Sequence, residues 1–204
     1  RLIYRPLPQT DFPEVVIIDA TSGIRLDSQG KPLVSPPHAF TFTDIKGAYG
    51  EREISILGQA GLMGEYSTAF KPGEAVHLVN LLRAMQGCRN GVYAVNGQSD
   101  VEIMKQARDS GLLKENLAAT TVVTRELFSR LLTRYLGIEY VAQIPGIYKS
   151  TWRDVPASLN GYTSLITGLT LFEVKGNKFE PAKPVTRAQT AVALIRSLPR
   201  LNAR

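Results

Sequence analysis

Cysteine and histidine, the residues that build disulfides and zinc centres, are nearly missing from this sequence. Its 204 residues include one cysteine, Cys88, and two histidines, His38 and His77. A single cysteine excludes a disulfide within the chain, and these three residues do not supply the ligand quartet of a structural zinc site. We therefore predict no metal site and no cofactor.

Long hydrophobic runs are also missing. The longest uninterrupted apolar stretches span a few residues, whereas a membrane-spanning helix needs about 20. We therefore predict no membrane insertion. The chain starts at Arg1, without a methionine or a charged-then-apolar leader. We interpret it as the C-terminal part of a longer secreted protein, with the signal peptide expected upstream of Arg1.

Enzyme motifs are missing too. The sequence contains no glycine-rich phosphate loop, no His-Glu-x-x-His and no Gly-x-Ser-x-Gly, the signatures of P-loop NTPases, zinc proteases and serine hydrolases. The carboxylates of Glu51 and Glu53 fall in a stretch that we expect to be solvated. We predict that the chain is not an enzyme.

Positive charge is concentrated at one end of the chain. The formal net charge is +6, and residues 152–204 hold eight basic and three acidic groups, against four of each in residues 1–38. A basic face favours an anionic partner, which is a nucleic acid, an acidic polysaccharide or a lipid surface. The basic residues match no nucleic-acid reader motif, so we predict no nucleic-acid binding.

Residues 1–38 differ from the rest of the chain by their β-rich pattern. Three short runs there are rich in β-branched residues, which favours strands. The runs are residues 2–4, 15–18 and 24–26. Residues 19–23 have the composition of a turn between strands, and the Pro-rich residues 31–37 have that of a linker.

The remainder of the chain carries a repeated unit. Three Gly-Leu pairs, beginning at positions 61, 111 and 168, each close an apolar segment, and a second amphipathic segment begins 13 to 18 residues later. Each copy of such a unit needs its neighbours to bury its apolar face. We place the copies at residues 39–98, 99–150 and 151–204, of which the second is degenerate and lacks a Phe-x-Pro sequence.

Apolar residues recur at helical spacing in both segments of each copy. The pattern predicts six helices in three pairs that share one core. Each first helix should end at its glycine, because glycine suits the left-handed C′ position. The predicted inward positions are Ile54, Leu57, Ala60, Val101, Met104, Ala107, Leu159, Tyr162, Ile166 and Leu169 in the first helices and Leu78, Leu81, Leu82, Met85, Leu127, Phe128, Leu131, Leu132, Tyr135, Ala188, Ala191, Val192, Ile195 and Leu198 in the second.

Two of the second helices begin with a threonine that is suited to cap them. Thr186 and Gln189 have the spacing of a capping box, in which each side chain binds the other residue's backbone amide. Thr124 is placed to cap the corresponding helix of the second copy. Both threonines therefore have a structural explanation.

The arginines that follow, Arg187 and Arg125, have no such explanation, because the first turn of a helix disfavours a cation. Two interpretations remain open. Either the arginine and the helix N-terminus hold an anion together, or the arginine forms a salt bridge with the aspartate that opens a neighbouring copy, such as Asp154 or Asp44.

Several of these segments match the sequence of a known repeat. They are Phe42-x-Asp44-Ile45, Gly61-Leu62-Met63-Gly64, Phe70-x-Pro72, Trp152-x-Asp154-Val155, Phe179-x-Pro181 and Val185-Thr186-Arg187-Ala188-Gln189. Together they resemble three tandem S-layer homology (SLH) repeats over residues 42 to about 200. The resemblance implies a mainly α fold, in which three helix pairs form a pseudo-threefold assembly within one monomeric chain, preceded here by a short β-strand segment.

The SLH resemblance also implies a ligand and its binding residues. Proteins of this family are anchored non-covalently to an anionic secondary cell-wall polysaccharide, often pyruvylated, which binds in grooves between adjacent repeats. The implied binding residues are Arg125, Arg187, Asp44, Asp100, Asp154, Trp152 and Gln189. Trp152 either stacks on a sugar ring or fills the core.

The first copy departs from the family pattern. Val76-His77-Leu78 stands where Val-Thr-Arg is usual, so we expect its groove to lack the arginine. His77 is then either a hydrogen-bond donor to a ligand or a structural residue. In the N-terminal region, the strand that leads into residues 19–23 faintly resembles the end of PepSY-like or YcdB-like exported domains.

Two functions follow from the sequence. The first is a non-catalytic anchor at the cell surface that binds a wall polysaccharide through Arg125 and Arg187. The second is a degenerate SLH scaffold that binds another part of its parent protein or a second subunit, without binding a glycan.

Overall fold

The computed structural model describes residues 2–4, 16–19, 25–26, 29–31, 39–66, 68–149 and 152–201. The chain divides into two compact units, Arg1–His38 and Ala39–Arg204. Each unit is described by itself below. The chain is mainly helical, and the helices belong to the second unit.

The first unit contains three short strands, β1 (Leu2–Tyr4), β2 (Val16–Ile18) and β3 (Arg25–Leu26). They pair antiparallel in the order β1-β2-β3. Most of the predicted turn at 19–23 and of the Pro-rich linker at 31–37 lies outside the described residues. The likeness of this region to PepSY-like domains therefore stays a prediction.

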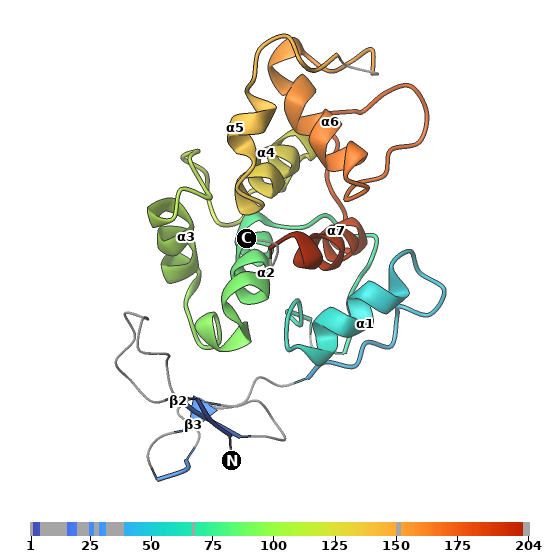
Figure 1. Cartoon of the computed structure of the whole chain (residues 1–204). Coiled ribbons are helices and arrows are strands. Elements are labelled where there is room, and N and C mark those ends of the chain that lie inside the picture. The colour runs from blue at the N-terminus through green and yellow to red at the C-terminus, as the bar shows by residue number, and fades with distance from the viewer. Residues whose placement is uncertain are drawn as a thin grey trace. The chain divides into compact units, whose positions relative to one another are not determined.

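Within the described part of the second unit, six helices have nine residues or more (Figure 1). They are α1 (Glu51–Gln59), α2 (Leu78–Asn90), α3 (Asp100–Asp109), α4 (Arg125–Tyr135), α6 (Asn160–Gly168) and α7 (Arg187–Leu201). The short helices η1 (Val92–Ala94), α5 (Glu139–Ala142) and η2 (Ala157–Leu159) complete the unit. None of the helices within the described residues has the length and apolar character that crossing a membrane requires.

The helices pack between the predicted repeats. Helix α1 packs against α7, α3 against α2, and α6 against α4 (Figure 1). The first helix of each predicted repeat therefore lies against the second helix of another repeat. The sequence predicts the three helix pairs but not these contacts, which join distant segments.

Three buried valines, one before each second helix, join the predicted repeats. The amide of Val76 donates to the carbonyl of Val185 over 2.9 Å, that of Val185 to Val123 over 2.9 Å, and that of Val123 to Val76 over 3.0 Å. The three side chains are fully buried. The hydrogen bonds form a closed ring, so each predicted repeat binds both of the others.

Each second helix also begins against the loop of another repeat. The first two amides of the helix donate to carbonyl oxygens there, and the spacing of these carbonyls is the same each time. The bonds run from Leu78 and Val79 of α2 to Thr121 and Ala119, from Arg125 and Glu126 of α4 to Lys183 and Pro181, and from Arg187 and Ala188 of α7 to Glu74 and Pro72. The protein itself therefore satisfies amides that helix N-termini usually leave open.

All six helices contribute to one main core, and most of the predicted inward positions are buried in it, whereas Leu159 and Tyr162 pack with Ala142 in a smaller cluster. Val101 and Ala60 are exceptions, because both are exposed, Val101 over 77% of its surface. Helix α3 instead turns Ile103, Met104 and Ala107 inward. Val101 was assigned wrongly because it is one helical turn from Met104, at the edge of the apolar stripe.

The Phe-x-Pro segments of the first and third repeats are turns held by an aspartate. Asp44 accepts hydrogen bonds from the amides of Phe70 and Lys71, both over 2.7 Å. Asp154 accepts from the amides of Phe179 and Glu180, both over 2.8 Å. Burial alone would raise the pKa of Asp44, but the two amides outweigh it and hold the pKa below its usual value.

The helix ends agree with the predicted glycine positions in two of three cases. Gly61 and Gly111 follow α1 and α3 with φ of 74° and 73°, which confirms a left-handed C′ residue at each. Gly168 instead lies inside α6, and Thr170 takes the left-handed position with φ of 56°. The segment that matches Gly61-Leu62 in space is thus Thr170-Leu171, and the pair at 168 was assigned in the wrong register.

We expect Asp44→Asn to lower the free energy of unfolding by about 1 kcal/mol, measured by urea denaturation at neutral pH. Asparagine keeps one acceptor oxygen where the carboxylate offers two, and solvent weakens the effect at this exposed position. Asp109→Asn is the matched control, because the side-chain partner of Asp109 among the described residues is the exposed Lys105 of its own helix. Its effect should stay within about 0.5 kcal/mol.

The effect of Asp44→Asn should also depend on pH. Because the pKa of Asp44 is lowered in the folded protein, the stabilisation is complete above the ordinary value of 3.8 and disappears as the pH falls through the lowered value. The stability difference between the two proteins should therefore shrink below about pH 4. An undiminished difference at about pH 2 would contradict the role of the ionised carboxylate.

Gly161→Ala should destabilise the protein strongly, since a β-carbon at Gly161 would overlap the carbonyl oxygen of Ala142 in α5. The expected loss is about 2 kcal/mol or more, because backbone must move to relieve the overlap. Gly168→Ala is the control in the same helix, where no atom lies within 4 Å of the added carbon. Thermal unfolding should show Gly168→Ala unchanged or stabilised by up to about 1 kcal/mol.

Candidate ligand-binding groove

The start of α7 forms the predicted capping box. The amide of Gln189 donates to Oγ1 of Thr186 over 3.2 Å, and the amide of Thr186 donates to Oε1 of Gln189 over 3.0 Å. At α4, the amide of Leu127 donates to Oγ1 of Thr124 over 3.3 Å, which confirms that cap too. Together with the loop carbonyls described above, the caps occupy the first three amides of each helix. Neither N-terminus therefore has an amide of its first turn left to bind an anion.

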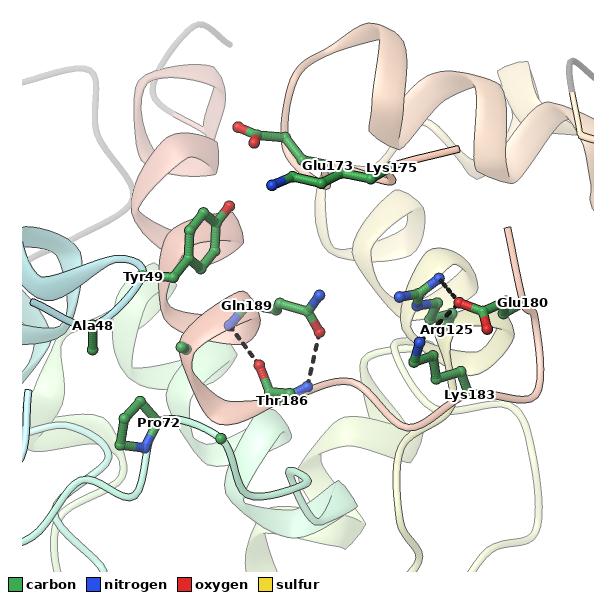
Figure 2. A pocket seen from close by; sticks show the side chains of 12 residues that line it. Ala48, Tyr49, Pro72, Arg125, Glu173, Lys175, Glu180, Lys183, Thr186 and Gln189 are labelled. Atoms are coloured by element: carbon green, nitrogen blue, oxygen red, sulfur yellow. Dashed lines mark hydrogen bonds and ion pairs between the residues drawn. The ribbon is translucent and has the colours of Figure 1, made fainter. Parts of the chain in front are cut away.

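A groove of about 620 Å³ lies beside this capping box (Figure 2). We call it the α7 groove. Its lining residues are Ala48, Tyr49, Pro72, Gly73, Arg125, Glu173, Lys175, Glu180, Lys183, Thr186, Ala188 and Gln189. They come from all three predicted repeats. Figure 2 shows Ala48, Tyr49 and Pro72 on one side, Arg125, Glu180 and Lys183 on the other, and Thr186 and Gln189 between them.

Arg125 reaches the groove wall from the first position of α4 and is only 8% exposed. Its Nη1 donates to the carbonyl of Phe179 over 2.6 Å and contacts Oε2 of Glu180 over 3.2 Å. Its Nε is buried and, within the described residues, has no hydrogen-bond partner. A buried polar nitrogen without a partner costs free energy. The Nε–H group of Arg125 is therefore a donor that no acceptor of the described residues satisfies.

Other charged side chains of the groove surround Arg125. Nζ of Lys183 lies 2.9 Å from Oε2 of Glu180. The hydrogen bond from Lys183 lowers the pKa of Glu180, and the charges of Lys183 and Arg125 lower it further. Lys175 is exposed, and no carboxylate of the described residues pairs with it. At the opposite side, burial and then the charge of Glu173 raise the pKa of the Tyr49 hydroxyl, which therefore stays protonated at neutral pH.

Arg187 has a different environment from Arg125, although both residues begin a helix. It is 1% exposed and donates to the carbonyls of Phe70 and Met63 over 2.6 and 2.9 Å. It also pairs with Glu65 over 2.8 Å. Its guanidinium is thus enclosed by the first repeat and is not among the residues that line the α7 groove.

The salt-bridge interpretation, one of the two left open by the sequence, named an opening aspartate such as Asp44 or Asp154 as the partner. The partners are instead Glu65 for Arg187 and Glu180 for Arg125. The aspartates were the wrong partners because their oxygens bind turn amides. The arginines instead bind the carbonyls of Phe70 and Phe179, the first residues of the same turns.

Of the predicted ligand-binding residues, the α7 groove contains Arg125 and Gln189. Trp152 is partly buried and packs against Phe179, with ring centroids 5.3 Å apart. Asp100 is the first residue of α3 and pairs with Arg83 over 2.7 Å, so it does not hold a turn as Asp44 does. A ligand role for Asp44, Asp100, Asp154, Trp152 or Arg187 stays a prediction.

Part of the α7 groove belongs to a segment of the chain that matches a known family. Residues 164–191 match the S-layer homology domain. SLH domains are typically non-catalytic modules that attach proteins to cell walls and cell surfaces, so the match indicates anchoring of this general kind. No curated protein matches the chain.

The SLH match spans the end of α6, the loop with the Phe-x-Pro turn and the start of α7. It therefore includes the wall of the α7 groove that carries Glu173, Lys175, Glu180 and Lys183. The sequence offered a weak signal for these residues, namely the excess of basic groups in residues 152–204. For Tyr49, on the opposite wall, the sequence offered none.

Two further pockets lie near α4. One, of about 280 Å³, adjoins the cap of α4 and is lined by Glu115, Leu117, Thr121, Val122, Thr124, Glu126, Leu127 and Arg130. The other, of about 380 Å³, lies between α4, α5 and α6. Within the described residues, no group of three or more histidine, cysteine, aspartate or glutamate side chains is arranged to hold a metal ion.

Arg187→Ala should destabilise the fold by about 3 kcal/mol or more, because it leaves two buried carbonyls and Glu65 without their partner. Lys105→Ala is the control, since Lys105 pairs with Asp109 of its own helix and 73% of its side chain is exposed. That variant should lose far less stability, because exposed ion pairs contribute little. Urea denaturation measures both, and equal effects would contradict a structural role for Arg187.

Proposed function

We propose that this chain is a non-catalytic anchor that attaches a secreted protein to an anionic, often pyruvylated, cell-wall polysaccharide. The polysaccharide binds in the α7 groove through charge and hydrogen bonds, and no covalent bond forms or breaks. In this proposal the three predicted segments are copies of one SLH-type repeat, arranged with pseudo-threefold symmetry in a monomeric chain.

The hydrogen bonds between the segments support the threefold arrangement. The ring of Val76, Val123 and Val185 gives each segment the same two neighbours. The starts of α2, α4 and α7 contact the loop of another segment through bonds of equal spacing. The helix contacts repeat in the same way, because α1 packs on α7, α3 on α2 and α6 on α4. In each contact, the first helix of one segment lies on the second helix of the preceding segment, and the third segment counts as preceding the first.

Arg125 is the observation on which the choice of an anionic ligand rests. It is a buried cation in the wall of an open groove, and within the described residues its Nε has no hydrogen-bond partner. A carboxylate from the ligand would take the charged contact that Nη1 makes with Glu180. Lys175 and Lys183 add positive charge around the same place, while the Tyr49 hydroxyl and the Gln189 amide offer hydrogen bonds to sugar hydroxyls.

The three segments do not offer equal grooves. Leu78, which is fully buried, holds the position in α2 that Arg125 and Arg187 hold in α4 and α7. Arg187 is enclosed by protein groups, as described above. We therefore propose that Arg125 marks the competent groove, and that a chain binds one polysaccharide end.

A protein-interaction scaffold is the alternative. Exposed apolar side chains around α5 favour it, because such side chains are common at protein contacts. They are Tyr140, Ile144 and Ile147, with exposed fractions of 69%, 40% and 61%. If this alternative holds, the chain should dimerise on a sizing column without any glycan and should not bind cell walls.

We expect purified cell-wall sacculi to retain the protein, and sacculi stripped of their anionic polymer to release it. Arg125→Gln with Lys183→Gln should weaken binding about tenfold or more, since two charge-assisted contacts are lost. Lys105→Gln with Lys114→Gln removes the same charge far from the groove and should bind as the wild type does.

Cosedimentation with the sacculi measures this binding, and circular dichroism checks that each variant is folded. Equal retention by intact and stripped sacculi would count against polysaccharide binding. Equal loss of binding in both double variants would indicate that net charge, and not the α7 groove, controls attachment.

A further inference from the structure

We propose that Glu180 is an internal competitor for the ligand in the α7 groove. Its carboxylate occupies the place between Arg125 and Lys183 that a ligand carboxylate would take, so binding requires Glu180 to move away. This inference rests on the proposed function, because it concerns the same groove. It adds a regulatory contact whose removal should strengthen binding.

The geometry places one oxygen of Glu180 between the two cations. Oε2 lies 3.2 Å from Nη1 of Arg125 and 2.9 Å from Nζ of Lys183. Close contacts of this kind between ions are the strong hydrogen bonds of proteins. The chain itself therefore already pairs both cations with one carboxylate, which leaves a net charge of +1 among the three side chains.

The backbone directs this carboxylate into the groove wall. Glu180 is the middle residue of the Phe-x-Pro turn and has φ of 54°, a conformation that non-glycine residues rarely adopt. The turn is held there by the bonds from the amides of Phe179 and Glu180 to Asp154. The position of Glu180 thus follows from the fold and not from attraction to Arg125 alone.

Comparison with Arg187 indicates that each arginine requires a carboxylate. In the first repeat, Lys71 occupies the turn position of Glu180, with φ of 58°. Arg187 takes its counter-ion from Glu65, which lies at a different place in the repeat. Glu180 and Glu65 occupy different positions in their repeats. The two ion pairs are therefore explained by the cost of burying an unpaired guanidinium, and not by a glutamate that the repeats share.

Only the Glu180 pair is placed for exchange. The side chain of Glu180 is 47% exposed and lines the groove, whereas that of Glu65 is 23% exposed and its partner Arg187 is 1% exposed. The Glu180 side chain can rotate toward solvent without disturbing the turn, because the hydrogen bond that holds its backbone comes from its amide and not from its carboxylate. An incoming carboxylate that replaces it would take over its contacts with Nη1 of Arg125 and Nζ of Lys183.

A titration with sodium pyruvate, a small carboxylate, tests this proposal without any cell wall. The signal is the NMR resonance of the Arg125 Nε–H group, which burial protects from fast exchange. Glu180→Gln keeps the length of the side chain and removes its charge, so we expect pyruvate to bind about tenfold more tightly than to the wild type. Glu180→Asn, which suits the left-handed backbone, should have the same effect.

Glu173→Gln is the matched control, because it removes one charge from the same groove. Glu173 pairs with Arg196 over 2.6 Å and not with Arg125. It should change pyruvate affinity about twofold or less, as a general field effect would. Combining Glu180→Gln with Arg125→Gln should abolish the gain.

Two results would overturn the proposal. One is equal pyruvate affinity in the wild type and in both Glu180 variants, and the other is an equal gain in Glu173→Gln. Neither result bears on attachment to sacculi. Conversely, failure of the wild type to bind sacculi would reject the proposed function even if Glu180→Gln bound pyruvate more tightly.

Discussion

Three valine amides that bind one another's carbonyls in a closed ring set the geometry of the helical unit. Val76, Val123 and Val185 each lie two residues before a second helix. The ring brings the starts of α2, α4 and α7 together, and each start then abuts the loop of a different segment. The rest of the packing depends on this constraint, because it decides which first helix each second helix can reach.

Two of the helices that the ring brings together begin with an arginine, and the two arginines have different surroundings. Arg125 and Arg187 are each the first residue of a second helix. Each donates a hydrogen bond to a backbone carbonyl of a Phe-x-Pro turn. Around Arg187, the carbonyl of Met63 and the carboxylate of Glu65 complete the set of partners. Around Arg125, Nε has no hydrogen-bond partner in the part of the chain that the structure describes, and a groove is open beside the side chain. One residue type thus stabilises the fold in one repeat and is available for a ligand in another.

The local features of the fold were predictable from the sequence. The helical stripes, the Thr186–Gln189 capping box and the left-handed Gly61 and Gly111 all depend on residues within a few positions of each other. Features that depend on aligning distant segments were less predictable. Gly168 was aligned with Gly61 in the wrong register, because it is the last residue of α6. Asp100 was aligned with Asp44, but it pairs with Arg83 and does not hold a turn.

The sequence by itself determined the helices, their caps, the repeated order of segments and the likeness of residues 164–191 to an SLH domain. Only the tertiary structure decided that helices pair between segments, that Arg187 is enclosed, and that Tyr49 and Lys175 face the same groove as Arg125. The physical reason is the range of the interactions. Caps and stripes act over one helical turn, whereas burial and ion pairing depend on which distant segments the hydrogen-bonded ring brings into contact.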